Sequence, residues 1–206
     1  MNSKEIRSFE FEVRAEQNEE RGTFLTGQPI VYNEPTDLGW YTEIIDDGAL
    51  NETDLRDVRF LVNHNTDMVP LARSRNNNAN STMQLEVVPN VGMTIRVDLD
   101  TENNSEARNL YSAVKRGDIS GMSFMFVVDR DKWEDLDSEH PTRHILSFSK
   151  VFEVSAVTFP AYDQTSIQAR GLSDALESAK TSLESAKAEL REIDNKRKKI
   201  KLLCEI

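Results

Sequence analysis

The stretch SGMSFMFVV, residues 120–128, contains one glycine and two serines among a run of large apolar side chains. Read as a strand, it presents four bulky side chains on one face: Met122, Phe124, Phe126 and Val128. Ser123 falls on the opposite face, where Gly121 leaves room for another backbone to come close. The stretch therefore predicts a core strand, with Ser123 either hydrogen-bonded within a sheet or free to do chemistry.

Short alternating or apolar runs of this kind recur along the chain and predict further strands. They cover residues 8–14, 23–32, 41–45, 59–64, 83–87, 93–99, 144–149 and 151–159. Gly, Pro, Asn or Asp separates most of them, as is typical of turns between strands. The sequence therefore predicts a core that is mainly β.

Two helices are expected to flank this core. Residues 104–117 carry an apolar stripe at helical spacing: Ala107, Leu110, Tyr111 and Val114. Gly117 follows the stripe, where a C-terminal cap is expected. A shorter helix is predicted over residues 52–58, with Asn51 as its N-cap. The fold class is thus α+β, mainly β with flanking helices.

The composition changes after residue 170, which predicts one globular domain over residues 1–170 and a long helical tail over residues 171–206. Apolar residues in the tail follow the spacing of a coiled-coil seam: Leu176, Ala179, Leu183, Ala186, Leu190 and Ile193, continued by Arg197 and Ile200. This pattern favours self-association as a dimer or higher oligomer. The alternative is a helix that packs against its own domain.

The overall composition narrows the possible partners. A formal net charge of −11 argues against direct nucleic-acid binding, because phosphate contacts need clustered Lys and Arg. The single cysteine, Cys204, can form no intramolecular disulfide and no thiolate zinc site, and it favours a reducing, intracellular setting. No run reaches the roughly 18 apolar residues that span a bilayer. We expect no membrane contact, no cofactor and no metal.

Three side chains supply the parts of nucleophilic catalysis: the Ser123 hydroxyl, the His64 imidazole and the Glu153 carboxylate. His64 ends the predicted strand 59–64, just before an Asn-rich loop. Taken alone, a histidine in this position is more often simply a polar residue at the end of a strand than a catalytic base. Glu153 lies in a strand apolar enough to be covered on both faces, so it needs a partner. That partner is His64 or an arginine, Arg96 or Arg143.

Four segments together resemble the prohead, or procapsid maturation, serine proteases of tailed bacteriophages. They are YTEIIDDGAL (41–50), RFLVNHN (59–65), AVKRGDISGMSFMF (113–126) and VFEVSAVTFPAYDQTS (151–166). The resemblance covers about residues 8–170 and assigns the family's histidine to His64, its serine to Ser123 rather than Ser120, and its acid to Glu153. The related herpesvirus assembly proteases use a second histidine as third member, so His140 and His144 remain possible substitutes.

The resemblance implies a compact β-barrel of the herpesvirus-protease type, extended by the C-terminal helix. It implies a serine endopeptidase that cleaves the scaffold segment of the major capsid protein, and its own chain, inside the assembling procapsid in the host cytoplasm. The helical tail would direct the enzyme into the shell or help it pair.

Two other functions fit the sequence less well. One is a non-enzymatic capsid assembly or scaffolding protein that dimerises through its C-terminal helix. The other is a metal hydrolase with His140 and His144 as ligands. Pro141 between these histidines makes a helical metal-binding pair improbable, and no third ligand suggests itself.

Overall fold

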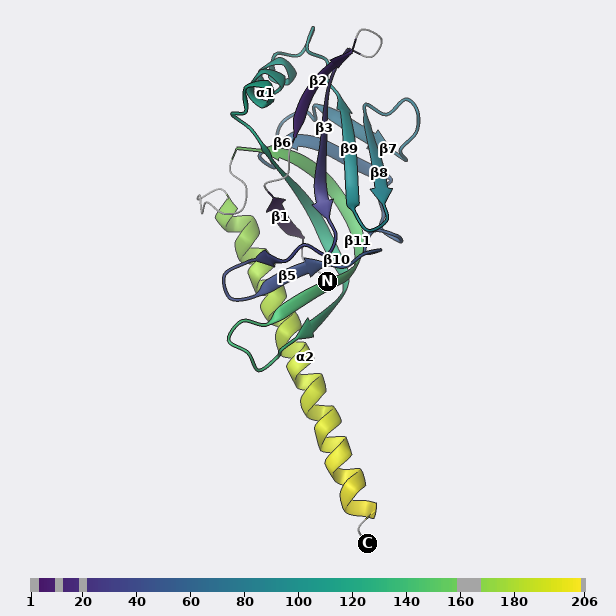
Figure 1. The fold of residues 1–206 in the computed structure, drawn as a ribbon, viewed down its shortest axis with the longest axis vertical. Helices are drawn as coiled ribbons and strands as arrows, with labels where there is room; N and C mark the ends of the chain where they lie inside the picture. The colour runs from purple at the N-terminus through teal and green to yellow at the C-terminus, as the bar shows by residue number, and fades with distance from the viewer. Residues whose placement is uncertain (1–3, 10–12, 19–21, 159–167, 205–206) are drawn as a thin grey trace.

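The computed structural model describes residues 4–9, 13–18, 22–158 and 168–204. In this part of the chain, two β-sheets pack together, a short helix lies at one end of them, and a long helix runs alongside and extends past them (Figure 1). The prediction of a mainly β fold of the α+β class is confirmed. No helix among the described residues is long and apolar enough to cross a membrane.

The first sheet is built around two long antiparallel strands, β10 (Gly121–Glu134) and β11 (Thr142–Val157). β1 (Glu5–Phe9) pairs with the outer side of β10 and forms the edge of the sheet. The other side of β11 carries two parallel partners in succession, β5 (Thr42–Ile45) and β6 (Asp57–Val62).

Two short strands complete this sheet: β4 (Thr36–Asp37) beside β5, and β7 (Ala72–Arg75) beside β6. The sequence predicted two strands, 144–149 and 151–159, where the structure has the single strand β11. Between Met125 and Phe126 the pairing shifts by one residue, which leaves Phe152 of β11 as the extra residue of a β-bulge. β11 continues through this irregularity as one strand.

The second sheet is antiparallel and contains β2 (Arg14–Asn18), β3 (Gly22–Val31), β9 (Gly92–Asp98) and β8 (Met83–Val88), in that order. The strand predicted over residues 8–14 spans the end of β1 and the start of β2. Residues 10–12 of that prediction lie outside the described residues.

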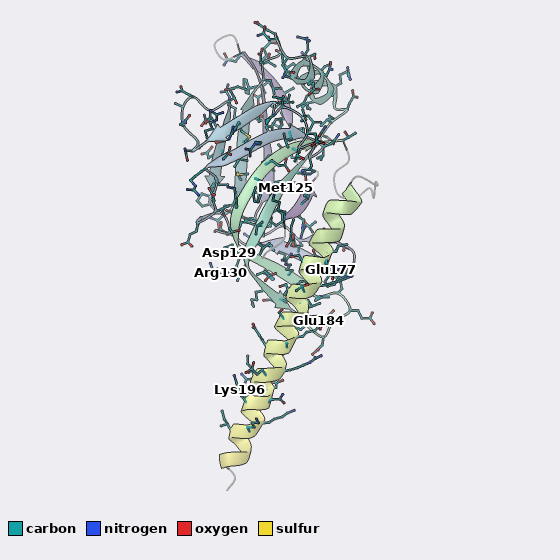
Figure 2. The ribbon with its side chains drawn as sticks, turned by 180° about the vertical axis from the view of Figure 1, so that it is seen from behind. Met125, Asp129, Arg130, Glu177, Glu184 and Lys196 are labelled. Atoms are coloured by element: carbon teal, nitrogen blue, oxygen red, sulfur yellow. The ribbon has the colours of Figure 1, made fainter. Side chains whose placement is uncertain are left out.

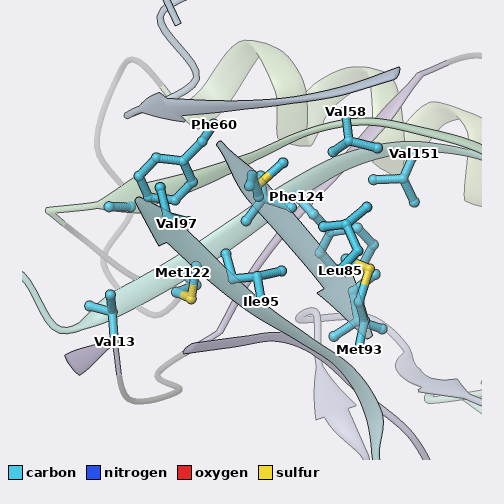
Figure 3. Packing of buried hydrophobic residues seen from close by; sticks show 14 of the residues in the cluster. Val13, Val58, Phe60, Leu85, Met93, Ile95, Val97, Met122, Phe124 and Val151 are labelled. Carbon is cyan, nitrogen blue, oxygen red and sulfur yellow. The ribbon is translucent and has the colours of Figure 1, made fainter. Parts of the chain in front are cut away.

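The main core lies between the two sheets (Figure 3). The four side chains predicted to share one face of β10 are all buried in it: Met122, Phe124, Phe126 and Val128. Ile95 and Met93 of β9 contribute to the core from the second sheet. Full burial of each such side chain stabilises the fold by about 1.5–3 kcal/mol. This packing fixes the orientation of β10 and directs Ser123 to the opposite face.

The described strands do not form the closed barrel that was expected. They form two open sheets instead. Side-chain hydroxyls replace a strand ladder where β7 meets the start of β8. The Arg73 N–H donates to Thr82 Oγ1 at 2.9 Å, and the Arg75 N–H donates to Ser81 Oγ at 2.9 Å. Since these edge donors bond to hydroxyls and not to a neighbouring strand's carbonyls, the hydrogen-bonded sheet ends there.

The helix predicted from residues 104–117 is confirmed as α1 (Ser105–Arg116). The Asn104 side chain caps its N-terminus, and Gly117 ends it with φ of 81°. The helix predicted over 52–58 is wrong. Residues 48–52 form turns, and Asp54 makes a parallel bridge with Lys150 that holds this segment against β11 until β6 begins.

In the long helix α2 (Gln168–Cys204), the first half of the predicted apolar seam packs against the β-sheet domain of the same chain. Ala179 and Leu183 are buried against Tyr41 and Trp133, with other side chains packed around them: Leu38, Trp40, Leu136, Leu176 and Ala186. Alanine in the seam lets flat aromatic rings approach the helix closely. For these positions the alternative of packing against the same domain is therefore the correct one.

The far part of α2, which carries Lys196, extends past the sheets, whereas Glu177 lies beside them (Figure 2). Three apolar side chains there are exposed: Leu190, Ile193 and Ile200. Self-association through this part of the helix stays a prediction, as does the domain boundary at residue 170.

Candidate active site

Three strands bring the candidate catalytic side chains together on one face of the first sheet. Ser123 on β10 lies directly opposite Ser155 on β11, and Glu153 is two residues before Ser155. β6 runs parallel to β11 with Val62 opposite Ala156, so its C-terminal end delivers His64 to this region. Residues 30 to 90 positions apart in sequence therefore meet because β11 is central to the sheet.

A tight turn after β6 orients His64. Asn63 and His64 both adopt left-handed backbone conformations, with φ of 51° and 55°. Such conformations cost non-glycine residues about 1–3 kcal/mol each and persist only where neighbouring contacts hold them. Here the Asn63 N–H donates to the Ala156 carbonyl at 2.9 Å, and the Asn63 side-chain carbonyl accepts from the Thr158 N–H at 2.9 Å. The turn is thus anchored to the end of β11.

His64 bridges the other two side chains. Its Nδ1 lies 2.5 Å from Glu153 Oε1, and its Nε2 lies 2.5 Å from Ser123 Oγ. A carboxylate accepts hydrogen bonds, so Glu153 assigns the proton of a neutral imidazole to Nδ1 and leaves Nε2 as the acceptor. The His64 side chain is 11% exposed, Glu153 is buried and Ser123 is 0% exposed. A hydroxyl, a base and an orienting acid are therefore aligned in a site with little water.

Ser155 is a fourth member of this constellation that sequence reasoning did not single out. Its hydroxyl donates to Glu153 Oε2 at 2.6 Å and accepts from the backbone N–H of His64 at 3.1 Å. The Ser155 side chain is fully buried and links the acid to the turn that carries the imidazole. The available signal was strand periodicity, which places Ser155 on the same face as Glu153.

The Ser123 hydroxyl has a further partner that the sequence did not predict. It donates to the backbone carbonyl oxygen of Arg7 at 2.7 Å. This carbonyl belongs to β1, whose Ser8 lies opposite Ser123 in the ladder with β10. The N-terminal strand therefore covers the candidate nucleophile.

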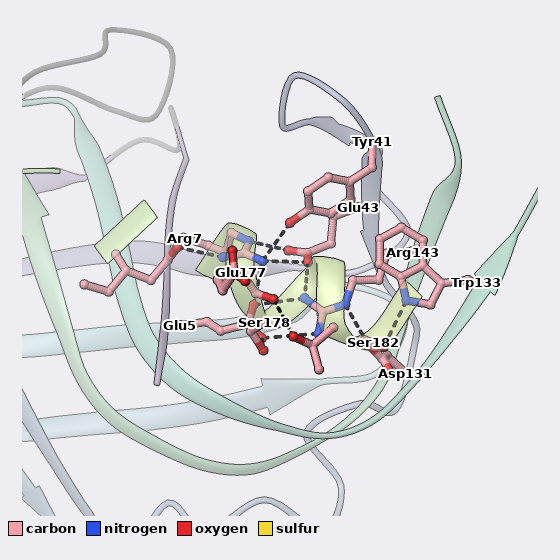
Figure 4. Close-up of polar contacts among 12 residues, drawn as sticks. Glu5, Arg7, Tyr41, Glu43, Asp131, Trp133, Arg143, Glu177, Ser178 and Ser182 are labelled. Atoms are coloured by element: carbon pink, nitrogen blue, oxygen red, sulfur yellow. Dashed lines mark hydrogen bonds and ion pairs between the residues drawn. The ribbon is translucent and has the colours of Figure 1, made fainter. Parts of the chain in front are cut away.

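The Arg7 and Glu5 side chains enter a buried charge cluster with Glu43 and Arg143 (Figure 4). Arg7 pairs with both Glu43 and Glu5, and its Nη2 lies 2.7 Å from an oxygen of each. Arg143 Nη1 lies 2.9 Å from Glu5 Oε2 and 3.1 Å from Glu43 Oε2. The cluster thus pairs two acids with two arginines.

The surroundings of this cluster shift the pKa values of its members. Burial by itself would raise the pKa of Glu5, but Arg7 and Arg143 lower it below the usual carboxyl value. Burial would likewise lower the pKa of Arg143, yet Glu43 and Glu5 raise it. Burial also raises the pKa of Tyr41 to about 12. Glu5 therefore stays charged while the Tyr41 phenol stays neutral.

The alternative site residues lie elsewhere. His144 Nδ1 is 2.8 Å from Asp46 Oδ1, and His140 Nε2 is 3.0 Å from Thr42 Oγ1. The arginines proposed as partners of Glu153 also have other contacts. Arg143 pairs with Glu5, Glu43 and Asp131, whereas Arg96 pairs with Asp98. Within the described ranges, no three His, Cys, Asp or Glu side chains gather as metal ligands.

A serine, a histidine and a carboxylate joined in this way on a mainly β scaffold define a candidate serine hydrolase site. The family model of the caudovirus prohead serine proteases matches residues 9–180, more than half of the chain. The chain belongs to this family. It is therefore a serine peptidase of capsid maturation, a class that acts on capsid proteins. No curated protein and no solved structure matches the chain.

Proposed function

We propose that the protein is a serine endopeptidase in which Ser123 is the nucleophile, His64 the general base and acid, and Glu153 the residue that orients His64. Its substrates are the scaffold segment of the major capsid protein and its own chain, inside the procapsid in the host cytoplasm. The observation that carries the proposal is the imidazole of His64, which lies 2.5 Å from both the hydroxyl and the carboxylate.

The first half of the reaction forms an acyl-enzyme. Ser123 Oγ bonds to the scissile carbonyl carbon while its proton passes to His64 Nε2. The imidazolium is stabilised by Glu153, which remains ionised and keeps its hydrogen bond to Nδ1. When the C–N bond breaks, Nε2 returns the proton to the leaving amine. The acyl group then remains on Ser123 as an ester.

The second half releases the acyl group. A water molecule attacks the ester carbon, its proton passes to His64 Nε2, and the proton is returned to Ser123 Oγ as the ester bond breaks. Glu153 orients His64 and stabilises its imidazolium in both halves of the reaction. The hydrogen bond from Ser155 to the second oxygen of Glu153 supports this role, because it restrains the carboxylate that faces the imidazole.

The test compares two serine variants that differ by three positions. The chain is incubated with the cognate coat protein, and new termini in both proteins are identified by mass spectrometry. Ser123→Ala is expected to reduce cleavage by about 10⁴-fold or more, since members of a triad act as a unit. Ser120→Ala is the matched control and should cleave normally, because Ser120 is exposed. Continued cleavage by Ser123→Ala would refute the assignment.

We also propose that the far part of α2 mediates self-association or docking in the shell. The exposed side chains of Leu190, Ile193 and Ile200 support this, because they follow the predicted seam beyond the part that packs in cis. Light scattering tests it: Ile193→Glu is expected to lower the oligomeric mass of the chain. An unchanged mass, or a monomeric parent chain, would exclude self-association through this surface.

A further inference from the structure

The strand β1 occupies the edge of the first sheet at the position of the candidate nucleophile. It pairs antiparallel with β10 from Glu5 opposite Phe126 to Phe9 opposite Met122, and none of the described strands pairs with its other side. Without β1, β10 would be the edge strand and would carry Ser123 on it. An edge strand offers unpaired N–H and C=O groups that bind an extended peptide by strand addition. β1 therefore fills a position suited to a substrate.

The hydrogen bond to Arg7 opposes catalysis. A serine hydroxyl has one proton, and two acceptors lie within its reach: the Arg7 carbonyl oxygen at 2.7 Å and His64 Nε2 at 2.5 Å. While the proton is donated to the Arg7 carbonyl it cannot pass to Nε2, so β1 competes with the base for the proton of the nucleophile. With β1 in place, Ser123 is also 0% exposed.

The buried charges allow β1 to leave without a large electrostatic penalty. β1 contributes one acid and one base, Glu5 and Arg7, which are also paired with each other at 2.7 Å. The body of the protein retains Glu43 paired with Arg143 at 3.1 Å. An unpaired buried charge is costly, but here each surface keeps a partner for its own charges after separation. The cluster therefore fits a strand that docks reversibly.

The helix α2 contacts β1, and Figure 4 shows Ser178 of α2 beside Glu5 of β1. Ser178 Oγ on α2 donates to Glu5 Oε1 at 3.0 Å. One turn further, Ser182 Oγ donates to Asp131 at 2.8 Å and accepts from Trp133 Nε1 at 3.0 Å, which fixes the helix to β10. The helix thus holds the strand in place, and it is the same helix whose far part is exposed.

We propose that β1 is an inhibitory strand: it occupies the place on β10 that an extended substrate segment must take to reach Ser123, and catalysis requires its release. The inference rests on the proposed function, in which Ser123 is the nucleophile. The strand begins before the region matched by the family model, which starts at residue 9.

A reversible cross-link tests the proposal in the full chain. Ile6 and Met125 lie directly opposite each other, and opposed residues of antiparallel strands have Cα atoms about 4.5–5.5 Å apart, within the range of a disulfide. The chain with Ile6→Cys and Met125→Cys, in a Cys204→Ser background, is treated with a fluorophosphonate probe before and after reduction. Reduction is expected to raise the labelling rate of Ser123 by at least about tenfold, because only a released strand exposes it.

The Ile6→Cys single variant is the control and should label equally in both redox states. Equal labelling of Ser123 in the oxidised and reduced double variant would overturn the inhibitory role while leaving the proposed function intact. If Ser123 is not labelled in either state and the reduced chain cleaves no coat protein, both the inference and the proposed function fail.

A second measurement uses the strand as a free peptide. A chain without residues 1–9 should label faster than the full chain, and the peptide KEIRSF, residues 4–9, should slow it again. The same peptide with alanine in place of Arg7 should inhibit at least about tenfold more weakly, since it cannot pair with Glu43. Equal inhibition by both peptides, or none by either, would contradict recognition of β1 through the charge cluster.

Discussion

Replacement of Ser155 by alanine tests how the acid and the base are held together. The hydroxyl makes two hydrogen bonds, one to Glu153 Oε2 and one from the His64 N–H. A bond to a charged group contributes about 1.5–3 kcal/mol and an ordinary one about 1 kcal/mol, so Ser155→Ala should lower the free energy of unfolding by roughly 2–4 kcal/mol. Denaturant titration at neutral pH measures this loss.

The same variant should impair catalysis through kcat. A shift of about 1 Å in a reacting group costs about 10²-fold in rate, and without Ser155 neither the carboxylate nor the turn at His64 is restrained. Because Ser155 acts through Glu153 and His64 and not on the substrate, KM should stay close to that of the parent chain. Peptide hydrolysis under saturating and limiting substrate separates the two constants.

Ser149→Ala is the matched control. Ser149 lies on the same strand but is exposed, and its hydroxyl donates only to the Val127 carbonyl at 3.3 Å among the bonds described. Its stability and kcat should be nearly those of the parent chain. If Ser155→Ala also retains parental stability and kcat, the positioning role of Ser155 is refuted.

Three further outcomes are expected. Glu153→Gln should lower kcat by about 10⁴-fold, because an amide can favour the wrong imidazole tautomer, whereas His144→Ala should remain active in peptide hydrolysis. Since the pKa of Tyr41 is raised to about 12 from about 10 in the unfolded chain, the free energy of unfolding should fall by about 2 kcal/mol between pH 10 and 12, and Tyr41→Phe should lack this component. Gly92→Ala should destabilise the fold by about 2–4 kcal/mol in thermal unfolding, because its φ is 129° and a Cβ would lie 2.0 Å from the Ile30 carbonyl oxygen.

A specific result would contradict each of these three predictions. If Glu153→Gln cleaves normally and His144→Ala is inactive, His144 and not Glu153 is the third member of the catalytic site. An identical alkaline stability profile for Tyr41→Phe would show that the phenol does not contribute. Gly39→Ala is the control for the glycine test, since its φ is 94° but no atom lies within 4 Å of the added Cβ. Equal losses in the two variants would mean that close approach at Gly92 is unimportant.

Local patterns in the sequence predicted the elements whose form depends on neighbouring residues. The period of two in β10 identified its buried face, and Gly117 with its preceding stripe identified α1, because side-chain alternation and cap chemistry act over a few residues. The helix predicted at 52–58 failed because the bridge between Asp54 and Lys150, about a hundred positions apart, outweighs local helix preference.

Long-range pairing explains what could not be predicted from the residues alone. His64 meets Glu153 only because β6 runs parallel to β11 and ends in a left-handed turn, and no local signal specifies that partner. The heptad pattern of α2 indicated an apolar seam, but not that Trp133 would cover it. The position of β1 depends on a pairing with β10, more than a hundred residues away, and so Arg7 escaped notice.

The site of covalent labelling by a fluorophosphonate tests directly whether Ser123 is a nucleophile activated by His64. The parent chain, the chain without residues 1–9, and each of these with His64→Ala are treated, digested and mapped by mass spectrometry. We expect an adduct on Ser123 that forms faster in the chain without residues 1–9 and is lost in both His64→Ala variants. An adduct on another serine, no adduct in either parent form, or labelling of Ser123 that does not depend on His64 would contradict this expectation.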